Sequence, residues 1–203
     1  MSERPVIVAC AALVSELRAV LAAAGLVDHV EVELLPAPLH NRPERIVPAI
    51  DARLSSLDPD RPVLLGYADC GTGGALDRWI DAGARRVARL PGAHCYEFFA
   101  GAERFAALHD DQPGTLYLTD FLAKHFDALV WAGLGLDRRP ELRDTYFGNY
   151  TRVVLLAQAR SAHVEAAATA AAERLGLPLV VEPTGLDPLA EAVRVRLGSE
   201  VGR

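Results

Sequence analysis

The chain is poor in several features that define common classes of protein. It contains one lysine, Lys124, no cluster of basic residues with interleaved aromatics, and a net charge of −6. Because nucleic-acid-binding proteins neutralise phosphates with lysine and arginine, nucleic acid is not an expected partner. No apolar run approaches the roughly 20 residues that cross a bilayer, so no membrane span is expected either.

The sequence also lacks the marks of secretion, of linkers and of repeats. Residues 1–5 lead straight into an apolar run, without the long apolar segment and cleavage site of a signal peptide. There is no Pro/Gly/Ser-rich linker, low-complexity tract or internal repeat. Three cysteines, an odd number, argue against a disulfide framework. We therefore expect a cytoplasmic protein with reduced thiols and a single domain over residues 1–203.

Apolar runs of strand length alternate with helical periodicities along most of the chain. The expected strands are Pro5–Ala9, Glu31–Leu35, Pro62–Tyr67, Arg86–Leu90, Thr115–Leu118, Arg152–Leu156 and Leu179–Glu182. The expected helices are Ala12–Ala24, Pro43–Leu57, Gly74–Ala82, Glu97–His109, Asp120–Ala132, Ala162–Leu175 and Pro188–Leu197. Short strands separated by helices are typical of βαβ units with buried parallel strands. The predicted fold class is α/β, a three-layer Rossmann-like and mostly parallel sheet with helices on both faces.

Each of the three cysteines follows an expected strand. Cys10 directly follows the first strand, and Cys70 and Cys95 follow the third and the fourth. Because the carboxyl ends of parallel strands meet at one edge of a sheet, where ligands bind, the three thiols are expected to converge. Such a site would hold either Zn²⁺ or an iron–sulfur cluster and leave one position open. The alternative for each cysteine is simple packing, since free cysteine is among the most buried residue types.

Residues 69–74, Asp-Cys-Gly-Thr-Gly-Gly, make a glycine-rich turn between a strand and a helix. At such a position the helix N-terminus is expected to favour the thiolate form of a cysteine. The turn also offers backbone N–H groups to an anionic cofactor, as phosphate sites do. These candidate cofactor-binding residues are Gly71, Thr72, Gly73 and Gly74. The alternative is a tight turn that needs glycine only for its backbone conformation.

Four side chains near the cysteines are candidates for acid–base chemistry or for further metal ligation. They are His40, Asp69, His94 and Glu97. His40 lies in the loop after the second strand, and it is either a ligand or general base or an uninvolved loop histidine. Because adjacent side chains of an extended segment point apart, His94 and Cys95 are not both expected as ligands unless a turn intervenes. Glu97 is alternatively a favourable charge in the first turn of a helix.

Residues 136–150 are dense in arginine, acidic and aromatic side chains. Arg143 is a candidate for binding a carboxylate or phosphate, because a guanidinium group meets such anions with two parallel hydrogen bonds. The alternative is an ion-paired bend that presents Tyr146 and Tyr150 to a second subunit, which would make the protein a homo-oligomer. The sequence does not separate the two interpretations.

Seven phrases of the chain, taken together, carry a family resemblance. They are the residues 9–13, 39–41, 69–74, 94–101, 117–122, 146–150 and 184–186. With them, the chain resembles DUF1638, a bacterial and archaeal family of unknown function. The resemblance brings no established catalytic residues. It implies an association with corrinoid-dependent methyl transfer, because members often lie beside genes of that system.

Three functional hypotheses follow. In the first, the protein is a metal-dependent enzyme with Cys10, Cys70 and Cys95 as ligands, and a small-molecule substrate takes the remaining position. Methyl or one-carbon transfer linked to corrinoid metabolism is the preferred reaction, because a zinc–thiolate site makes a bound thiol a methyl acceptor. In the second, it is a non-catalytic accessory that binds a metal or a corrinoid or methyltransferase protein. In the third, the glycine-rich turn binds an anion or nucleotide and the cysteines are simply packed.

Overall fold

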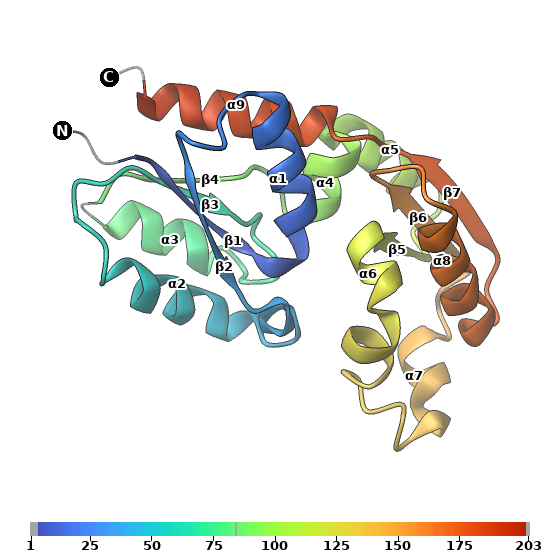
Figure 1. The fold of residues 1–203 in the computed structure, drawn as a ribbon. Coiled ribbons are helices and arrows are strands. Elements are labelled where there is room, and N and C mark those ends of the chain that lie inside the picture. Colours follow the sequence, from blue (N-terminus) through green and yellow to red (C-terminus); the bar gives the residue numbers. More distant parts are fainter. Residues whose placement is uncertain (1–3, 84, 202–203) are drawn as a thin grey trace. The chain divides into compact units, whose positions relative to one another are not determined.

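The computed structural model describes residues 4–83 and 85–201. The strands form two sheets, and the chain divides into two compact units (Figure 1). Unit 1 takes the described residues of Met1–Phe98 and Asp187–Arg203, and unit 2 takes Phe99–Leu186. The expectation of a single domain over residues 1–203 stays a prediction, since compactness alone does not establish separate domains.

Unit 1 is built on a parallel four-stranded sheet in the order β2-β1-β3-β4. Its strands are β1 Val6–Cys10, β2 Glu31–Leu35, β3 Val63–Gly66 and β4 Val87–Arg89. Its helices are α1 Val14–Ala23, α2 Ile46–Leu54, α3 Ala75–Ala82 and α9 Asp187–Val201, and α4 Cys95–Ala100 begins here and ends in unit 2. Short 3₁₀ helices cover Ala11–Leu13, Ala37–Asn41 and Pro43–Arg45.

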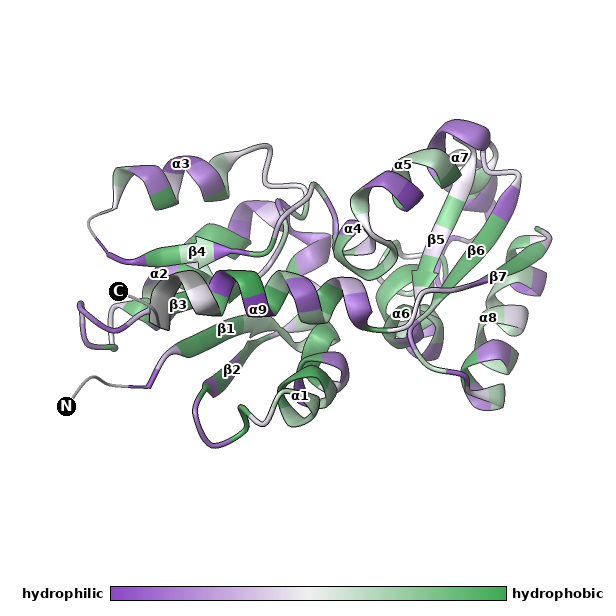
Figure 2. Cartoon of the chain, turned by 90° about the horizontal axis from the view of Figure 1, so that it is seen from above, coloured by the Kyte–Doolittle hydropathy of each residue, from purple (hydrophilic) through white to green (hydrophobic). Residues whose placement is uncertain are grey.

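Helices cover both faces of the unit 1 sheet. α2 and α3 lie on one face, and α1 and α9 lie on the other (Figure 1, Figure 2). Since successive strand residues point to opposite faces, Val6 and Val8 of β1 pack in one cluster with Ile46 and Ile50 of α2. Every residue of β1 is buried, which explains why the sequence shows a continuous apolar run there rather than an alternation.

The strand order of unit 1 reverses at β1. From β1 the chain runs outward to β2 and then crosses back to β3 and β4 on the other side. In parallel α/β sheets, ligands bind in the crevice outside the carboxyl ends of the strands at such a reversal. β1 and β3 lie close together at this end, because a Cβ atom at Gly66 would be 2.5 Å from the Cβ of Ala9. The fold therefore predicts a ligand site beside the loops that follow β1 and β3.

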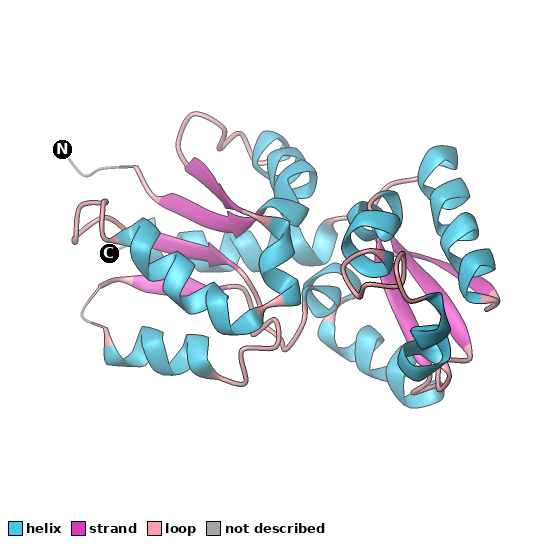
Figure 3. Cartoon of the chain, turned by 90° about the horizontal axis from the view of Figure 1, so that it is seen from below, coloured by secondary structure: helices cyan, strands magenta, loops and turns pink. Residues whose placement is uncertain are grey.

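Unit 2 has a parallel three-stranded sheet in the order β5-β6-β7, flanked by helices (Figure 3). Its strands are β5 Thr115–Thr119, β6 Arg152–Ala157 and β7 Leu179–Pro183. Its helices are α5 Ala102–Asp111, α6 Asp120–Lys124, α7 Arg143–Phe147 and α8 Ala162–Leu175, with a π-helical segment at Asp127–Trp131 and a 3₁₀ helix at Pro140–Leu142. Leu155 of β6 packs in one core cluster with Ala168 and Leu175 of α8. Together, the two parallel sheets confirm the predicted α/β class.

Some helix boundaries differ from those predicted. The helix expected over Glu97–His109 is divided into α4 and α5 at Gly101, whose φ of +83° is left-handed. The helix expected over Asp120–Ala132 does begin at Asp120, where the Thr119 hydroxyl accepts a hydrogen bond from a backbone N–H. Its α-helical part ends at Lys124. Among the described residues, no helix is both long and apolar enough to cross a bilayer.

Candidate functional site

Four of the predicted site residues lie at or after the carboxyl ends of the four strands of unit 1. Cys10 is the last residue of β1, His40 follows β2, Cys70 follows β3 and Cys95 follows β4. All four line one cavity of about 20 Å³, together with Tyr67. A volume of that size holds about one water molecule. The structure thus brings together the three cysteines and His40, as the sequence predicts.

Cys10 and His40 are in direct contact. The Cys10 Sγ lies 3.5 Å from the His40 Nδ1 and accepts a hydrogen bond from the Ala12 N–H at 3.4 Å. Burial raises the pKa of Cys10 to about 11, although the Ala12 N–H acts in the opposite direction. His40 is exposed as a residue, but its ring lies against the cavity, and this desolvation lowers the pKa of His40. A protonated thiol therefore faces a neutral imidazole at neutral pH.

Cys70 has an unusual backbone conformation. Its φ of +52° makes it the one non-glycine residue with left-handed backbone in the described part of the chain. Such a conformation costs about 1 kcal/mol or more for a residue with a Cβ atom, so the surroundings must hold it in place. Two backbone hydrogen bonds do so, from Asp69 N to Gly92 O at 3.1 Å and from Cys70 N to Ala93 O at 2.9 Å. These bonds tie the loop of Cys70 to the loop that leads into Cys95.

The cysteine thiols of the cavity are neutral rather than ionised. Burial raises the pKa of Cys70 to about 12, and burial also raises the pKa of Cys95. The expected stabilisation of a Cys70 thiolate by the helix N-terminus is therefore outweighed by desolvation. A bound cation would reverse this balance, because a thiol that coordinates a metal loses its proton.

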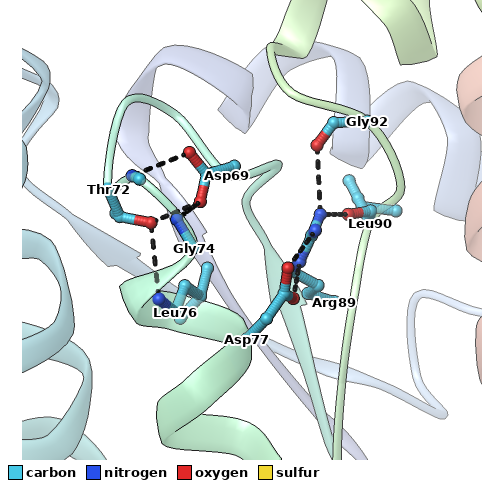
Figure 4. A network of polar contacts seen from close by, with 9 residues as sticks. Asp69, Thr72, Gly74, Leu76, Asp77, Arg89, Leu90 and Gly92 are labelled. Carbon is cyan, nitrogen blue, oxygen red and sulfur yellow. Dashed lines mark hydrogen bonds and ion pairs between the residues drawn. The ribbon is translucent and has the colours of Figure 1, made fainter.

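The glycine-rich turn binds the carboxylate of Asp69, a residue of the same turn. The Asp69 carboxylate accepts hydrogen bonds from the Thr72 hydroxyl at 2.5 Å, from Gly74 N at 2.8 Å and from Gly73 N at 3.1 Å (Figure 4). Burial alone would raise the pKa of Asp69, but these hydrogen bonds outweigh it and leave the pKa below its ordinary value. Gly71 lies in the same turn, with a φ of +82°. The N–H groups of Gly73 and Gly74, two of the candidates for binding an anionic cofactor, are thus already bonded to the Asp69 carboxylate.

Arg89 holds the loop after β4 in place. Its guanidinium donates hydrogen bonds to both carboxylate oxygens of Asp77 in α3, at 2.5 and 2.8 Å. It also donates to the carbonyl oxygens of Leu90 at 2.8 Å and Gly92 at 3.1 Å (Figure 4). The hydrogen bond from Arg89 lowers the pKa of Asp77. Arg89 thereby holds the loop that leads to Cys95.

Two of the predicted acid–base candidates make local contacts instead of lining the cavity. His94 is exposed, and its ring lies edge-on to Tyr96 with the ring centroids 6.2 Å apart. The Glu97 carboxylate accepts hydrogen bonds from Ala93 N at 2.7 Å and from His94 N at 3.4 Å. Glu97 therefore stabilises the start of α4, which is the alternative role considered for it.

Arg143 lies in unit 2, at the start of α7. Its Nη1 is 2.5 Å from the carboxylate of the neighbouring Asp144. Tyr146 is exposed, while the Tyr150 ring contacts the Phe147 ring with the centroids 5.7 Å apart. The segment therefore has the local structure of the ion-paired bend, and its use as a subunit contact stays a prediction.

Tyr67 also lines the cavity. The sequence pattern placed it at the end of an expected strand, and it was not predicted as a site residue. It comes directly after β3, is 1% exposed, and stacks on the His40 ring with the centroids 6.3 Å apart and the planes at 16°. One signal could have found it. A buried tyrosine usually needs a partner for its hydroxyl, and this one closes an apolar run three residues before Cys70.

A family model covers most of the chain. Residues 34–193 match the model described as "Protein of unknown function (DUF1638)". The chain belongs to the DUF1638 family. The matched region contains His40, Tyr67, Cys70 and Cys95, whereas Cys10 precedes it. No match was found among curated proteins or among solved structures.

The cavity of this DUF1638 protein is not a preformed coordination sphere. Across residues 4–83 and 85–201, no group of three or more His, Cys, Asp or Glu side chains is arranged to hold a metal ion as it stands. The cysteines are free thiols that line the same cavity. Metal coordination there requires the side chains around the cavity to rearrange.

Proposed function

We propose that unit 1 binds one soft divalent metal ion, zinc in the first place, through Cys10, Cys70 and Cys95. The observation that carries this proposal is that three cysteines from three distant segments of the chain line a single cavity where the strand order reverses. Packing alone gives no reason for all the cysteines of the chain to meet at the edge of a sheet where ligands bind. Thiolate sulfur together with imidazole is a donor set that suits zinc.

The size of the cavity favours a single ion over an iron–sulfur cluster. A space of about 20 Å³ accepts one atom-sized guest, whereas a cluster brings several iron and sulfide atoms. His40 is a further donor, with its Nδ1 3.5 Å from the Cys10 sulfur. With three cysteine ligands, one position stays open for an exchangeable ligand, as in catalytic rather than structural zinc sites.

For the reaction, we propose methyl or one-carbon transfer to a small thiol substrate, with a methylated corrinoid as the donor. The thiol gives up its proton on binding, and the neutral His40 imidazole beside the cavity is the proposed acceptor. The substrate sulfur then attacks the methyl carbon, so the S–C bond forms as the Co–C bond breaks and the corrinoid keeps the electron pair. Free thiols in the site require a reducing compartment such as the cytoplasm.

Metal analysis of anaerobically purified protein tests the proposal directly. We expect colourless protein with one zinc ion per chain, and zinc-dependent loss of the methylcobalamin spectrum when 2-mercaptoethanol is added. Metal-free protein serves as the control for the second measurement. Brown protein with a broad visible absorption band would show that the site holds an iron–sulfur cluster instead of zinc. Folded protein that takes up no metal would refute the metal site.

A second candidate is a non-catalytic accessory that holds a metal for a corrinoid or methyltransferase protein. One observation favours it: at about 20 Å³ the cavity has the size of a single small guest, so a substrate beside the ion requires the cavity to open. In that case the metal would be bound, but no added thiol would reach it. Spectroscopic titration of the metal-loaded protein with 2-mercaptoethanol separates this candidate from the enzyme.

Arg89→Lys is expected to lower the affinity for zinc on the order of tenfold, the range seen when groups that orient metal ligands are changed. Lysine keeps the charge but loses the paired hydrogen bonds to Asp77 and the reach to the Leu90 and Gly92 carbonyls. Competition against a chromophoric chelator measures the affinity. Arg194→Lys is the matched control, because Arg194 pairs with Glu191 on the exposed surface of α9. Equal affinities of the two variants would contradict the positioning role.

A further inference from the structure

The strand β7 leaves apolar side chains exposed at one edge of the unit 2 sheet. β7 covers Leu179–Pro183 and is the last strand in the order β5-β6-β7 (Figure 2). Val180 is 41% exposed and Val181 is 39% exposed. Because successive strand residues point to opposite faces, these two valines leave both faces of the sheet partly uncovered at this edge. Strands of parallel sheets are normally buried on both faces, so the exposure calls for an explanation.

The backbone of β7 also presents hydrogen-bonding groups along its outer edge. On its inner side, the Val153 N–H of β6 donates to the Pro178 carbonyl at 2.8 Å, and the Thr184 N–H donates to the Ala157 carbonyl of β6 at 2.9 Å. The even-numbered residues of β7 therefore face β6, and the odd-numbered residues direct their N–H and C=O groups outward. Within the part of the chain that the structure describes, these outward groups have no hydrogen-bond partner.

β7 lacks the features that keep the other described edge strands from pairing. β2, at one edge of the unit 1 sheet, carries the charged residues Glu31 and Glu33, and β4, at the other edge, has three residues. β5, the other edge strand of unit 2, is buried along most of its length. β7 has five residues and one charge, Glu182, whose carboxylate forms an ion pair with Arg104 of α5. An exposed apolar edge of this kind is a template for pairing with another strand.

We propose that β7 pairs antiparallel with β7 of a second copy of this chain, about a two-fold axis at Val181. This inference does not depend on the metal site. In the proposed register the two Val181 residues exchange both of their N–H···O=C bonds, because both groups of this residue point outward. The Leu179 N–H of each copy donates to the Pro183 carbonyl of the other. The ladder ends at this pair, since proline has no N–H.

The side chains of β7 are complementary to themselves in this register. The odd-numbered residues share one face and are all apolar, so an apolar row extends across both copies, with Val181 opposite Val181. On the other face Val180 lies opposite Glu182, whose charge is paired with Arg104 of its own chain. No like charges therefore lie directly opposite each other, an arrangement that would be destabilising. A two-fold pair also leaves no β7 edge free, so the assembly closes as a dimer.

Sedimentation analysis of the full chain at micromolar concentration measures the association. The wild type is expected to be a dimer. Val181→Lys places two positive charges opposite each other at the axis, and it is expected to weaken the dimer on the order of tenfold or more. Val195→Lys is the matched control, because Val195 is 48% exposed on α9 of unit 1, and it is expected to keep the dimer of the wild type.

Val181→Cys tests the register without adding a charge. The Cα atoms of a hydrogen-bonded antiparallel pair are about 5.5 Å apart, within the range that a disulfide spans. Treatment with diamide is expected to link two Val181→Cys chains into a dimer that reductant separates. Val195→Cys and the wild type are expected to stay unlinked.

Each of the other outcomes overturns the proposal. They are a monomeric wild type, a dimer that withstands Val181→Lys, an equal loss in Val195→Lys, and wild-type assemblies larger than a dimer. A Val181→Cys protein that diamide leaves unlinked overturns it as well. This last measurement decides the matter if Val181→Lys does not fold, which circular dichroism reveals.

Discussion

Replacing Cys70 by serine is expected to abolish stoichiometric zinc binding. The substitution exchanges a soft sulfur donor for a hydroxyl of similar size at the centre of the proposed ligand set. Changes to groups that only orient metal ligands cost up to about a hundredfold in affinity, so the loss of a ligand must exceed that. Elemental analysis and chelator competition on the purified variant measure the effect. Cys10→Ser and Cys95→Ser are expected to behave in the same way.

A companion substitution separates loss of the metal from damage to the fold. Glycine adopts the left-handed backbone of Cys70 without the strain that a Cβ atom brings there. Cys70→Gly is therefore expected to leave the stability of metal-free protein within about 1 kcal/mol of the wild type while removing the metal. His94→Ala is the control with full metal content, because His94 is exposed and outside the cavity. Undiminished zinc in folded Cys70→Ser or Cys70→Gly would refute the assignment.

Local sequence signals predicted the elements of the fold well, but they could not group those elements. The strand at Glu31–Leu35 has the predicted bounds, and β1 is displaced by one residue. Buried parallel strands are continuous apolar runs, and such runs are visible without a structure. Whether successive strands share one sheet depends on contacts between residues far apart in the chain. The division into a four-stranded and a three-stranded sheet was therefore not predictable from periodicity.

The cysteines were predictable as site residues, whereas the roles of the other candidates depend on side-chain contacts that the sequence does not show. Cys10, Cys70 and Cys95 were predictable because each follows a strand, and strand ends in a parallel sheet share one edge. Asp69 and Glu97 stand in the same phrases, yet their carboxylates accept hydrogen bonds from nearby backbone N–H groups. An acidic residue can bind nearby backbone N–H groups or take part in chemistry in a cavity. Only the direction of its side chain, which the sequence does not show, distinguishes the two roles.

Removal of the metal is expected to destabilise unit 1 and to leave unit 2 nearly unchanged. The proposed ligands come from the end of β1, from the loop after β3 and from the start of α4, so the ion would cross-link three segments of unit 1. A ligand at a thousandfold excess over its Kd stabilises the folded state by about 4 kcal/mol. In a chain of this size that corresponds to a rise in Tm on the order of 10 °C. Calorimetry with and without a strong chelator measures the shift.

Hydrogen exchange locates the effect within the chain. Addition of a chelator is expected to speed the exchange of amides in β1 and β3, while those in β6 of unit 2 keep their protection. Cys70→Gly provides the control, because a variant that holds no metal has none to lose and its exchange should not respond to the chelator. Uniform loss of protection in both units would mean that the ion stabilises the chain from elsewhere. If hydrogen exchange of the wild-type protein does not change when the chelator is added, the metal site is refuted. The three cysteines are then packed thiols without a metal.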